Sequence, residues 1–425
     1  MNYEEALEYI HDVSWRGSKK GLSRTRELLR LLGNPHKELK FVHIAGTNGK
    51  GSTSACIESI LRCAGYKTGL YTSPYITRFN ERMQVNGRPI EDGELAELTT
   101  YVKPFAESMA EHPTEFELIT ALAMKYFNDN ACDIVVLEVG LGGELDSTNV
   151  IDPPELAVIT AMGYDHMQQL GNDMKSIASA KAGIIKPGTE VVIYGQNEEA
   201  DAVFEKTCSE LGVPLHKTDY STLNVKKYTL TGTVMDYKGY KDIKLALAGT
   251  FQPYNAAVSI TAAEVLREKG WHITDGDIYK GLETVRWPGR FELVRRDPVF
   301  MIDGAHNTHG IAAMSTCIKT MFKGVKPVFL VGVMADKDVS HMTAMIAELA
   351  KCVIAVRPDN TRSMEAEALA DCFRAAGVCA ESRSSISEGV AAAIEAAGRE
   401  GVVIALGSLY FSSDVRRAVK EMENA

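Results

Sequence analysis

The sequence lacks long hydrophobic runs, closely spaced cysteine pairs and an excess of positive charge. Apolar runs such as residues 402–406 are far shorter than the ~20 residues that a membrane-spanning helix needs, so we expect no membrane span. The first ten residues, MNYEEALEYI, have neither the basic start nor the apolar stretch of a secretion signal. Acidic side chains outnumber basic ones by 56 to 46, and the net charge of −10 disfavours a broad nucleic-acid surface. A local basic pocket for a phosphate stays compatible with this balance.

The eight cysteines include no C-x-x-C pair, and several of them lie in apolar segments. In a chain without a secretion signal, this distribution is typical of reduced thiols in the protein core, so we expect a cytoplasmic protein. The cysteines are at positions 56, 63, 132, 208, 317, 352, 372 and 379.

What is present is an ordinary globular composition. The chain has 425 residues, of which 45% are apolar and 24% charged, and this balance argues against disorder. At roughly 100–200 residues per domain, the length indicates two or three domains, each with its own core.

Short apolar segments alternate with amphipathic ones over most of the chain, which predicts an α/β fold with a mostly parallel sheet. The expected strands are 41–45, 67–71, 134–139, 156–160 and 190–194, and then 299–302, 328–333, 352–356 and 402–406. The expected helices are 3–10, 25–32, 52–64, 92–109, 115–128, 174–185 and 255–269. Residues 15–22 (WRGSKKGL) are expected to form a basic loop.

Two segments interrupt this alternation. Residues 217–247 alternate Thr, Tyr, Val and Lys around a Lys238-Gly239 turn signal, which predicts an antiparallel ribbon. The helix-breaking cluster WPGR at 287–290 indicates a domain boundary just beyond it. We therefore expect an N-terminal P-loop-type domain over 1–295, which includes the ribbon, and a smaller C-terminal Rossmann-like domain over 296–425.

The sharpest local signal is a glycine-rich segment between an apolar strand and a helix. Residues 46–52 read GTNGKGS. Such a turn directs backbone N–H groups and a helix N-terminus at a polyphosphate, and Lys50 can neutralise its β- and γ-oxygens. The spacing departs from G-x-x-x-x-G-K-[ST], because Gly51 separates Lys50 from Ser52. A glycine-rich turn without a ligand is the alternative.

Polar side chains follow three further strands. Ser73 comes after the strand at 67–71, Glu138 ends the run 134–137, and His166 follows the strand at 156–160. Because the carboxyl ends of parallel strands meet at one edge of a sheet, we expect these side chains to converge on a metal beside the phosphates. Oxygen ligands suit Mg²⁺, so His166 is the less typical member, and a structural role is its alternative.

Two other motifs are less specific. The segment GLGGELDSTN at 140–149 matches a dinucleotide fingerprint only in part, and the Asp-Pro-Pro that follows indicates a loop. The segment DGAHN at 303–307 places a carboxylate and an imidazole at a strand end. This arrangement suits nucleotide or substrate binding, and a capped turn is the alternative.

Taken together, these motifs resemble the folylpolyglutamate synthase/dihydrofolate synthase family of Mur-ligase-like, ATP-dependent amide ligases. The resemblance extends over nearly the whole chain, and the order of the motifs makes it far more specific than any one of them. The motifs are HIAGTNGKGS (43–52), TSPYITRFNERM (72–83), TEFE (114–117), EVGLGGELDSTNV (138–150), DHMQQLG (165–171), KAGIIKPG (181–188), QPYNAA (252–257), WPGRFE (287–292), DGAHN (303–307), DKD (336–338) and GSLY (407–410).

The resemblance implies that the N-terminal domain holds ATP and Mg²⁺, that the C-terminal domain closes over them, and that Lys50, His166 and Lys181 are catalytic. It implies that Lys181 is carbamylated, which would turn the cation into a carboxylate-like metal ligand. The implied Mg²⁺ ligands are Ser73, Glu138, His166 and the modified Lys181. The implied ATP-binding residues are Gly49, Lys50, Gly51, Ser52, Asn255, Arg290, Asp303 and His306.

The resemblance also implies three segments that hold a pterin-containing acceptor. They are Leu22, Ser23, Arg24 and Thr25; Thr114, Glu115 and Phe116; and Leu145, Asp146 and Ser147. The family often has Arg at Glu144, Glu at Ala180 and His at Phe251, and Glu144 adjoins the third segment. The nature of the acceptor is therefore the expectation that these departures weaken most.

The implied reaction is amide formation in two steps, in which ATP phosphorylates a substrate carboxylate and L-glutamate then displaces the phosphate. The acceptor is a reduced folate, dihydropteroate or both. We expect small-molecule substrates only, no nucleic acid or membrane partner, and a monomer. The competing readings are a related ligase with another carboxylate acceptor, a non-catalytic nucleotide-binding regulator and, suggested only by residues 140–143, a nicotinamide dehydrogenase.

Overall fold

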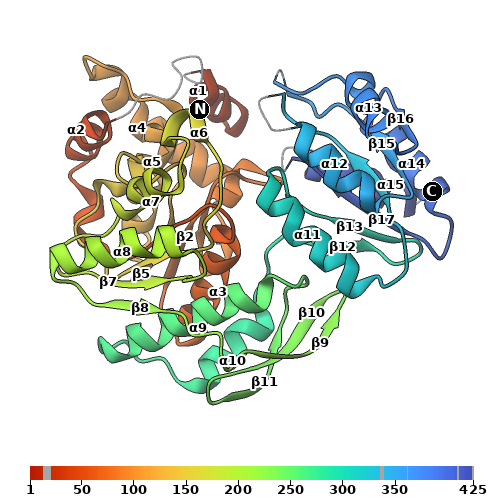
Figure 1. Ribbon diagram of the computed structural model, residues 1–425. Helices are drawn as coiled ribbons and strands as arrows, with labels where there is room; N and C mark the ends of the chain where they lie inside the picture. The colour runs from red at the N-terminus through yellow and green to blue at the C-terminus, as the bar shows by residue number, and fades with distance from the viewer. Residues whose placement is uncertain (13–20, 336–338, 361, 409–410, 424–425) are drawn as a thin grey trace. The chain divides into compact units, whose positions relative to one another are not determined.

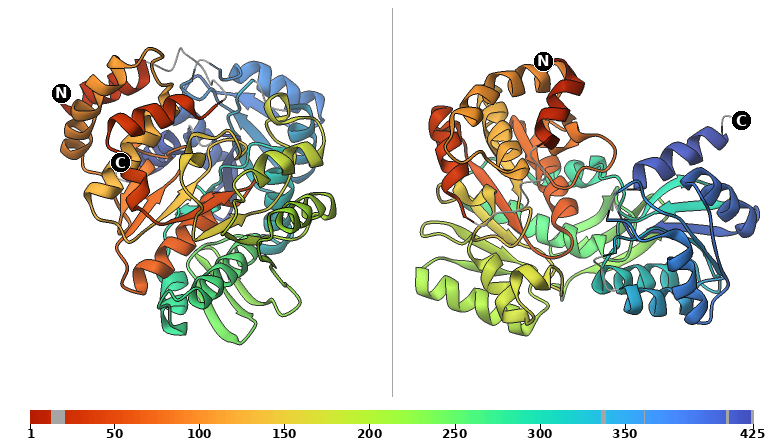
Figure 2. Two further views of the ribbon diagram at one scale, coloured as in Figure 1. Left: turned by 90° about the vertical axis from the view of Figure 1, so that its left-hand side faces the viewer. Right: turned by 90° about the horizontal axis from the view of Figure 1, so that it is seen from above.

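The computed structural model describes residues 1–12, 21–335, 339–360, 362–408 and 411–423. The chain forms two compact units, each built from two stretches of sequence. The first unit combines Met1–Thr222 with Tyr254–Val285, and the second combines Leu223–Pro253 with Arg286–Ala425. Figures 1 and 2 show the helices and strands of each unit.

The first unit is built on an eight-stranded sheet in the order β4-β3-β2-β5-β1-β6-β7-β8. The strands from β2 to β8 in this order are parallel, and β3 and β4 add an antiparallel edge beside β2. The strands are β1 Phe41–Ala45, β2 Thr68–Tyr71, β3 Met83–Val85, β4 Arg88–Pro89, β5 Ile134–Glu138, β6 Leu156–Ile159, β7 Glu190–Ile193 and β8 Leu215–Lys217.

Two core clusters on one face of this sheet join it to helices, and α3 also packs against β1, β2 and β5. One core cluster joins apolar side chains of β1, β2 and β5 to helices α1, α2, α4 and α5, and another joins β6 and β7 to α7 and α8. The helices are α1 Tyr3–Asp12, α2 Ser23–Leu31, α3 Lys50–Cys63, α4 Asp92–Ser108, α5 Glu115–Asp129, α6 Met167–Leu170, α7 Met174–Ala182, α8 Glu198–Leu211, α9 Gln252–Glu268 and α10 Asp275–Thr284. The short 3-10 helices are η2 Pro35–Glu38, η3 Phe79–Arg82 and η4 Ser147–Val150.

The central strands are buried along their whole length, which explains their nearly continuous apolar sequences. Every residue of β1, β5 and β6 is buried, as expected where helices cover both faces of a parallel sheet. Thr114 and Glu117 form a capping box at the start of α5, and Asp173 caps α7. These caps fix where two helices of the site begin.

The second unit combines a three-stranded antiparallel ribbon with a six-stranded sheet in the order β12-β13-β17-β14-β15-β16. Core clusters on the two faces of the larger sheet join it to α11–α13 and to α14 and α15. The strands are β9 Asn224–Thr229, β10 Gly232–Tyr237, β11 Tyr240–Leu245, β12 Glu292–Arg295, β13 Val299–Ile302, β14 Val328–Val331, β15 Cys352–Ala355, β16 Ala380–Ser382 and β17 Val402–Leu406. The helices are α11 Thr308–Met321, α12 Val339–Leu349, α13 Ala366–Ala375, α14 Ile386–Ala397 and α15 Ser412–Glu423.

The predicted α/β class, the mostly parallel sheet, the antiparallel ribbon and the second α/β sheet are confirmed. The division of the chain differs from the expected one. The compact units part at Val285 rather than at residue 295, and the ribbon belongs to the second unit. The reason is that Leu230, Ala248 and Phe251, which flank or end the ribbon, pack in the core of the second unit.

Candidate active site

The phosphate loop, residues 46–52, connects the end of β1 to the first turn of α3. Gly46 and Gly49 have φ angles of +149° and +86°. A Cβ at Gly46 would lie 1.9 Å from Thr160 Oγ1, and one at Gly49 would lie 2.6 Å from Asn255 Oδ1. Only glycine therefore fits at either position, and the loop lies against both the end of β6 and the start of α9.

Hydrogen bonds from the two residues that follow β6 hold the same loop in place. The backbone N–H groups of Thr47 and Asn48 donate to Ala161 O at 3.0 and 3.1 Å. The hydroxyl of Thr160 donates to Asn48 O at 2.9 Å. The loop is thus fixed before any ligand binds, and α3 begins at Lys50, where the helix N-terminus favours an anion.

Two lysines converge on one carbonyl of this loop. Lys181 Nζ on α7 donates to Gly46 O at 2.8 Å, and Lys50 Nζ lies 3.3 Å from the same oxygen and 3.4 Å from Thr47 O. Burial, with a further contribution from Lys50, lowers the pKa of Lys181 to about 7. The loop therefore combines a cation suited to phosphate with a second lysine that is partly uncharged at neutral pH.

The structure brings Ser73 and Glu138 together at the carboxyl ends of β2 and β5. The backbone N–H of Ser73 donates to Glu138 Oε2 at 3.3 Å, and Glu138 is only 4% exposed. A buried carboxylate beside a hydroxyl is a donor set that a hard cation prefers.

His166 sits differently from these two residues. It precedes α6 in a left-handed conformation with φ +51°, its side chain is 46% exposed, and its Nε2 lies 4.0 Å from Asp165 Oδ1. Within the described residues, no group of three or more His, Cys, Asp or Glu side chains is arranged to hold a metal. The expected Mg²⁺ site therefore stays a prediction, and its support is the pair of oxygen donors at the ends of β2 and β5. Its expected ligands are Ser73, Glu138, His166 and Lys181.

The third expected acceptor segment is part of the 140–151 loop, which follows β5. Leu145 is 48% exposed, whereas Asp146 and Ser147 are buried. Asp146 accepts hydrogen bonds from the N–H groups of Leu141 and Thr148, and burial raises the pKa of its carboxyl group. Asp146 thus stabilises the loop itself, and Leu145 is the member that faces solvent.

The first two acceptor segments meet through a buried ion pair. Arg24 donates from Nε and Nη2 to the two carboxylate oxygens of Glu117, both at 2.9 Å, and Glu117 also accepts from the Thr114 N–H. This forked pair ties α2 to the start of α5. Phe116 also lies against the start of the 140–151 loop, since a Cβ at Gly140 would lie 2.5 Å from its Cζ.

The remaining members of these segments differ in exposure. Thr25 is buried, Leu22 is half-buried and Ser23 is exposed. Glu115 Oε1 lies 2.9 Å from His11 Nδ1. All three segments belong to the first unit, in which Arg24 ties the first to the start of α5 and Phe116 lies against the start of the 140–151 loop.

In the second unit, the WPGR and DGAHN turns lie against each other. Gly304 N–H donates to Gly289 O, and Asp303 accepts from the N–H groups of Phe291 and Ala305, each at 2.8 Å. Burial raises the pKa of Asp303, while the nearby Arg290 opposes that shift. His306 Nδ1 lies 2.7 Å from Gly304 O.

The capped-turn reading of DGAHN describes part of this geometry. Asn307 Oδ1 accepts from the Gly310 N–H at 2.7 Å and caps α11. Arg290, Asp303 and His306 are thus brought together around one turn, while Asn255 lies beside the phosphate loop in the first unit. Their contacts with ATP stay a prediction.

Comparisons with known proteins decide the family. Residues 44–263 match the Mur ligase middle domain, and residues 289–409 match the Mur ligase glutamate ligase domain. A dihydrofolate synthase/folylpolyglutamate synthase of Bacillus subtilis is 39% identical over 430 residues, covering 98% of this chain and 99% of that protein. The chain belongs to the folylpolyglutamate synthase/dihydrofolate synthase family of Mur ligases.

Two solved structures of relatives bear on the ligands of this family. A Mycobacterium tuberculosis folylpolyglutamate synthase complexed with ADP and AMPPCP is 26% identical with a TM-score of 0.87, and the match covers 100% of this chain and 99% of that one. A folylpolyglutamate synthase complex with AMPPCP and folate is 33% identical with a TM-score of 0.84, covering 99% and 100%. The predicted family and ATP-dependent ligase class are confirmed, so the nicotinamide dehydrogenase reading is wrong.

Three residues that hold parts of the site have no role assigned to them from the sequence. Thr160 holds the phosphate loop, and Glu117 holds Arg24. His43 on β1 contacts Thr148 of the 140–151 loop. Thr160 directly follows a strand, and T-x-x-E at 114–117 is a capping-box pattern, so two of these signals were present. Residues 15–20, 336–338 and 409–410 of the predicted motifs lie outside the described residues.

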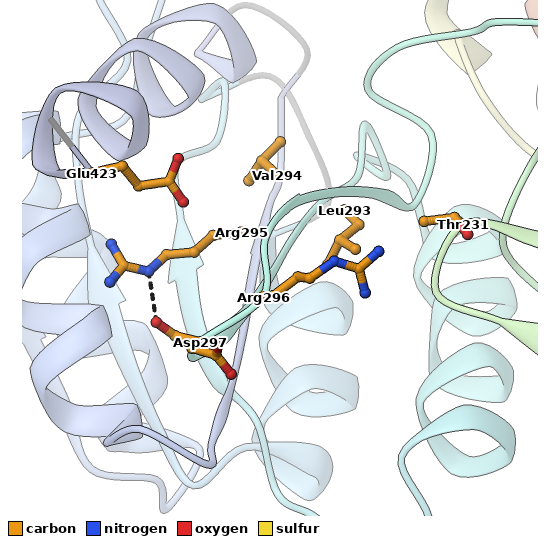
Figure 3. Close-up of a pocket in the computed structure, with 7 residues that line it drawn as sticks. All are labelled: Thr231, Leu293, Val294, Arg295, Arg296, Asp297 and Glu423. Carbon is orange, nitrogen blue, oxygen red and sulfur yellow. Dashed lines mark hydrogen bonds between the residues drawn. The ribbon is translucent and has the colours of Figure 1, made fainter.

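A hollow of about 590 Å³ lies elsewhere, in the second unit, at the turn between β12 and β13. Its lining includes Arg295, Arg296 and Asp297, and none of the predicted site residues. Figure 3 shows the guanidinium groups of Arg295 and Arg296 on opposite sides of the turn, with Arg295 Nε donating to Asp297 O at 2.8 Å. The two cations therefore do not converge on one point of the hollow. Among the described residues, no helix has both the length and the apolar character to cross a membrane.

Proposed function

We propose that this ligase joins L-glutamate to the carboxylate of a folate-type acceptor, either a reduced folate or dihydropteroate, at the expense of ATP. The observation that carries the proposal is the convergence of Lys50 and Lys181 on Gly46 O, in a phosphate loop closed by glycines. The family membership and the relative complexed with AMPPCP and folate support the nature of the nucleotide and the acceptor.

The proposed reaction has two steps. An acceptor carboxylate oxygen attacks the γ-phosphorus of ATP, the bond to the bridging oxygen breaks, and ADP leaves. The amine of glutamate then attacks the acyl carbon, phosphate leaves with the bond electrons, and the nitrogen loses a proton to give the amide. Lys50 and the N–H groups of the phosphate loop stabilise the negative charge that moves between the oxygens.

Mg²⁺ is the cofactor proposed beside ATP, and Ser73, Glu138 and His166 would hold it. When bound, the ion would neutralise phosphate charge. The buried carboxylate of Glu138 next to Ser73 fits this ion, because both residues offer oxygen donors.

We propose that Lys181 is carbamylated. Its pKa of about 7 leaves much of the side chain as a free amine at neutral pH. The amine nitrogen forms a bond to the carbon of CO₂ and releases a proton, which yields a carbamate anion. That anion would join the proposed Mg²⁺ ligands and place a negative charge where the unmodified chain has a cation.

Nucleotide and acceptor binding are proposed for the residues that the family motifs indicate. For ATP these are Gly49, Lys50, Gly51, Ser52, Asn255, Arg290, Asp303 and His306. For the acceptor they are the segments 22–25, 114–116 and 145–147, of which Arg24 ties the first to α5 and Phe116 brings the second against the start of the 140–151 loop. Eight free cysteines, all in the described residues, fit the proposed cytoplasmic location, and we propose a monomer.

A coupled assay tests the proposal. The purified chain, given ATP, Mg²⁺, glutamate and either tetrahydrofolate or dihydropteroate, should release ADP and form the glutamyl product detected by mass spectrometry. Lys50→Ala should lower kcat by about a hundredfold or more, because a cation at the phosphates is lost. Lys206→Ala removes a lysine that is 75% exposed on α8 and should leave the rate unchanged.

Each other outcome of the assay contradicts a part of the proposal. ATP binding without glutamate-dependent ADP release would indicate a regulator, and turnover with only another carboxylate would reject the folate assignment. Equal activity of Lys50→Ala and Lys206→Ala would reject the role of Lys50.

A further inference from the structure

A chain of buried polar side chains connects strand β1 to the 140–151 loop. His43 in the middle of β1 is fully buried, and its Nε2 lies 2.9 Å from Thr148 Oγ1. The Thr148 hydroxyl in turn donates to Asp146 Oδ1 at 2.5 Å. The same strand ends at Ala45 and leads directly into the phosphate loop.

The directions of these hydrogen bonds determine where the protons are. The Asp146 carboxylate accepts from Leu141 N–H at 2.8 Å and from Thr148 N–H at 3.0 Å, so it acts as an acceptor on both oxygens. Thr148 has one hydroxyl hydrogen, which it donates to this carboxylate. Its lone pair therefore accepts from His43, and the hydrogen of the imidazole lies on Nε2.

The other imidazole nitrogen supports this assignment. Nδ1 of His43 is buried and has no hydrogen-bond partner among the described residues, so it cannot carry an N–H without leaving a donor unsatisfied. Burial, with a smaller contribution from Lys186, lowers the pKa of His43 to about 3. A polar ring in a core strand is costly unless it is bonded, so the single bond to Thr148 accounts for its presence there.

We propose that His43 is a positioning residue for the acceptor, which fixes the 140–151 loop by donating from Nε2 to Thr148. The proposal rests on the proposed function, in which Leu145, Asp146 and Ser147 hold the acceptor. The donated hydrogen directs the Thr148 hydroxyl at Asp146, and Asp146 then holds the Leu141 N–H at the opposite end of the loop. His43 thereby fixes the conformation of the 140–151 loop from β1, the same strand that leads into the phosphate loop.

Other contacts hold a different part of the loop. Asn149 Nδ2 donates to Glu144 O at 3.0 Å and to Gly183 O at 2.9 Å, and Lys186 Nζ donates to Asn149 O at 3.0 Å. These bonds connect the loop to the end of α7. Losing His43 should therefore loosen the Asp146 turn while the Asn149 end stays in place.

Two pairs of variants test the donor. His43→Leu keeps the buried volume and removes the hydrogen bond, whereas His43→Gln keeps an N–H donor at similar reach. Thr148→Val and Thr148→Ser form the matching pair on the loop. We expect KM for the folate acceptor to rise about tenfold in His43→Leu and Thr148→Val, as for one lost buried hydrogen bond, with KM for ATP unchanged. His43→Gln and Thr148→Ser should stay within about twofold of wild type.

Two measurements without substrate separate this proposal from the proposed function. Long-range ¹H–¹⁵N correlation spectra should show His43 protonated at Nε2 and unprotonated at Nδ1 at neutral pH. Amide hydrogen exchange at Leu141 and Thr148 should be about tenfold faster in Thr148→Val than in Thr148→Ser, which holds even where His43→Leu fails to fold.

An imidazolium, a hydrogen on Nδ1, or equal exchange in the two Thr148 variants would overturn the proposal. Equal increases in KM for ATP and acceptor would overturn it too, because they would indicate a general structural role. Absence of turnover in the wild type would reject the proposed function and the positioning of an acceptor. The tautomer and exchange results would then decide only whether His43 fixes the loop.

Discussion

At the scale of single residues, the first unit keeps two lysines in surroundings that disfavour their charge. Lys181 is buried against the phosphate loop, and Lys186 donates to Asn149 O at 3.0 Å and to Ile151 O at 2.5 Å. Burial lowers the pKa of Lys186 to about 8, with Asp152 opposing the shift and Arg26 adding to it. The lysine that supports the 140–151 loop is therefore a titratable part of the fold.

This environment predicts a pH-dependent stability. Between pH 8 and the ordinary lysine pKa near 10.5, the unfolded chain still binds the Lys186 proton and the folded chain does not, so the free energy of unfolding rises with pH. Lys186→Met should remove at most about 1.4 kcal/mol per pH unit of that slope. Urea unfolding of wild type and variant at pH 8, 9 and 10 measures it.

The exposed Lys206 provides the control, since Lys206→Met should keep the wild-type slope. Parallel stability curves for wild type and Lys186→Met would contradict the shifted pKa. Lys181 contributes with the same sign in both proteins, so it cancels in the comparison.

At the scale of elements, the conformation of the phosphate loop depends on glycines that lack a Cβ atom. Gly49 and Gly188 have nearly equal φ angles of +86° and +85°, but a Cβ at Gly188 would meet nothing within 4 Å. A Cβ at Gly49 would lie 2.6 Å from Asn255 Oδ1. The two positions thus share the backbone requirement and differ in whether another element lies against the glycine.

Alanine substitutions at Gly49 and Gly188 should differ in their effects on stability and on ATP affinity. Gly188→Ala should cost about 1 kcal/mol of stability from the left-handed backbone alone and leave the affinity for ATP unchanged. Gly49→Ala should cost more and weaken ATP binding by at least about tenfold, because the added Cβ displaces the side chain of Asn255 from the loop. Isothermal titration with a non-hydrolysable ATP analogue and urea unfolding measure both effects. Equal losses in the two variants would show that Asn255 does not restrict the loop.

At the scale of the whole molecule, the chain passes between its two compact units three times, at 222–223, 253–254 and 285–286. The segment 223–253 is therefore an insertion in the sequence of the first unit, although Leu230, Ala248 and Phe251 in it pack in a core cluster of the second. Phe251 packs there with the fully buried Phe291.

Fragments test this division. A fragment 1–285 in which about twenty Gly and Ser residues replace 223–253 should fold and stay soluble. The fragment 1–295, cut at the boundary expected from the sequence, leaves Leu230, Ala248 and Phe251 without their core and should bind a hydrophobic dye and aggregate. Circular dichroism, dye fluorescence and light scattering compare the two. Equally soluble fragments would contradict the assignment of the ribbon.

The elements that could be predicted are those whose own residues show a pattern of apolar side chains. β1, β5 and β17 are continuous apolar runs, and they were predicted within a residue or two of their observed ends. β3, β4 and α6 have only three, two and four residues, and β3 and β4 exist because they pair beside β2. Such short elements have too few residues for a period, so tertiary pairing determines them.

The sequence by itself determined the family, the α/β class, the glycine-rich phosphate loop and the candidate residues at the strand ends, because each depends on residue type and order within a short segment. Tertiary structure decided that Lys181 meets Gly46 O, that Arg24 is committed to Glu117 and that the ribbon belongs to the second unit. It also decided that His43 is bonded to Thr148 across 105 positions of sequence. These contacts form because buried polar groups hydrogen-bond to one another once segments distant in sequence become neighbours. The spacing of residues within a short segment does not predict such contacts.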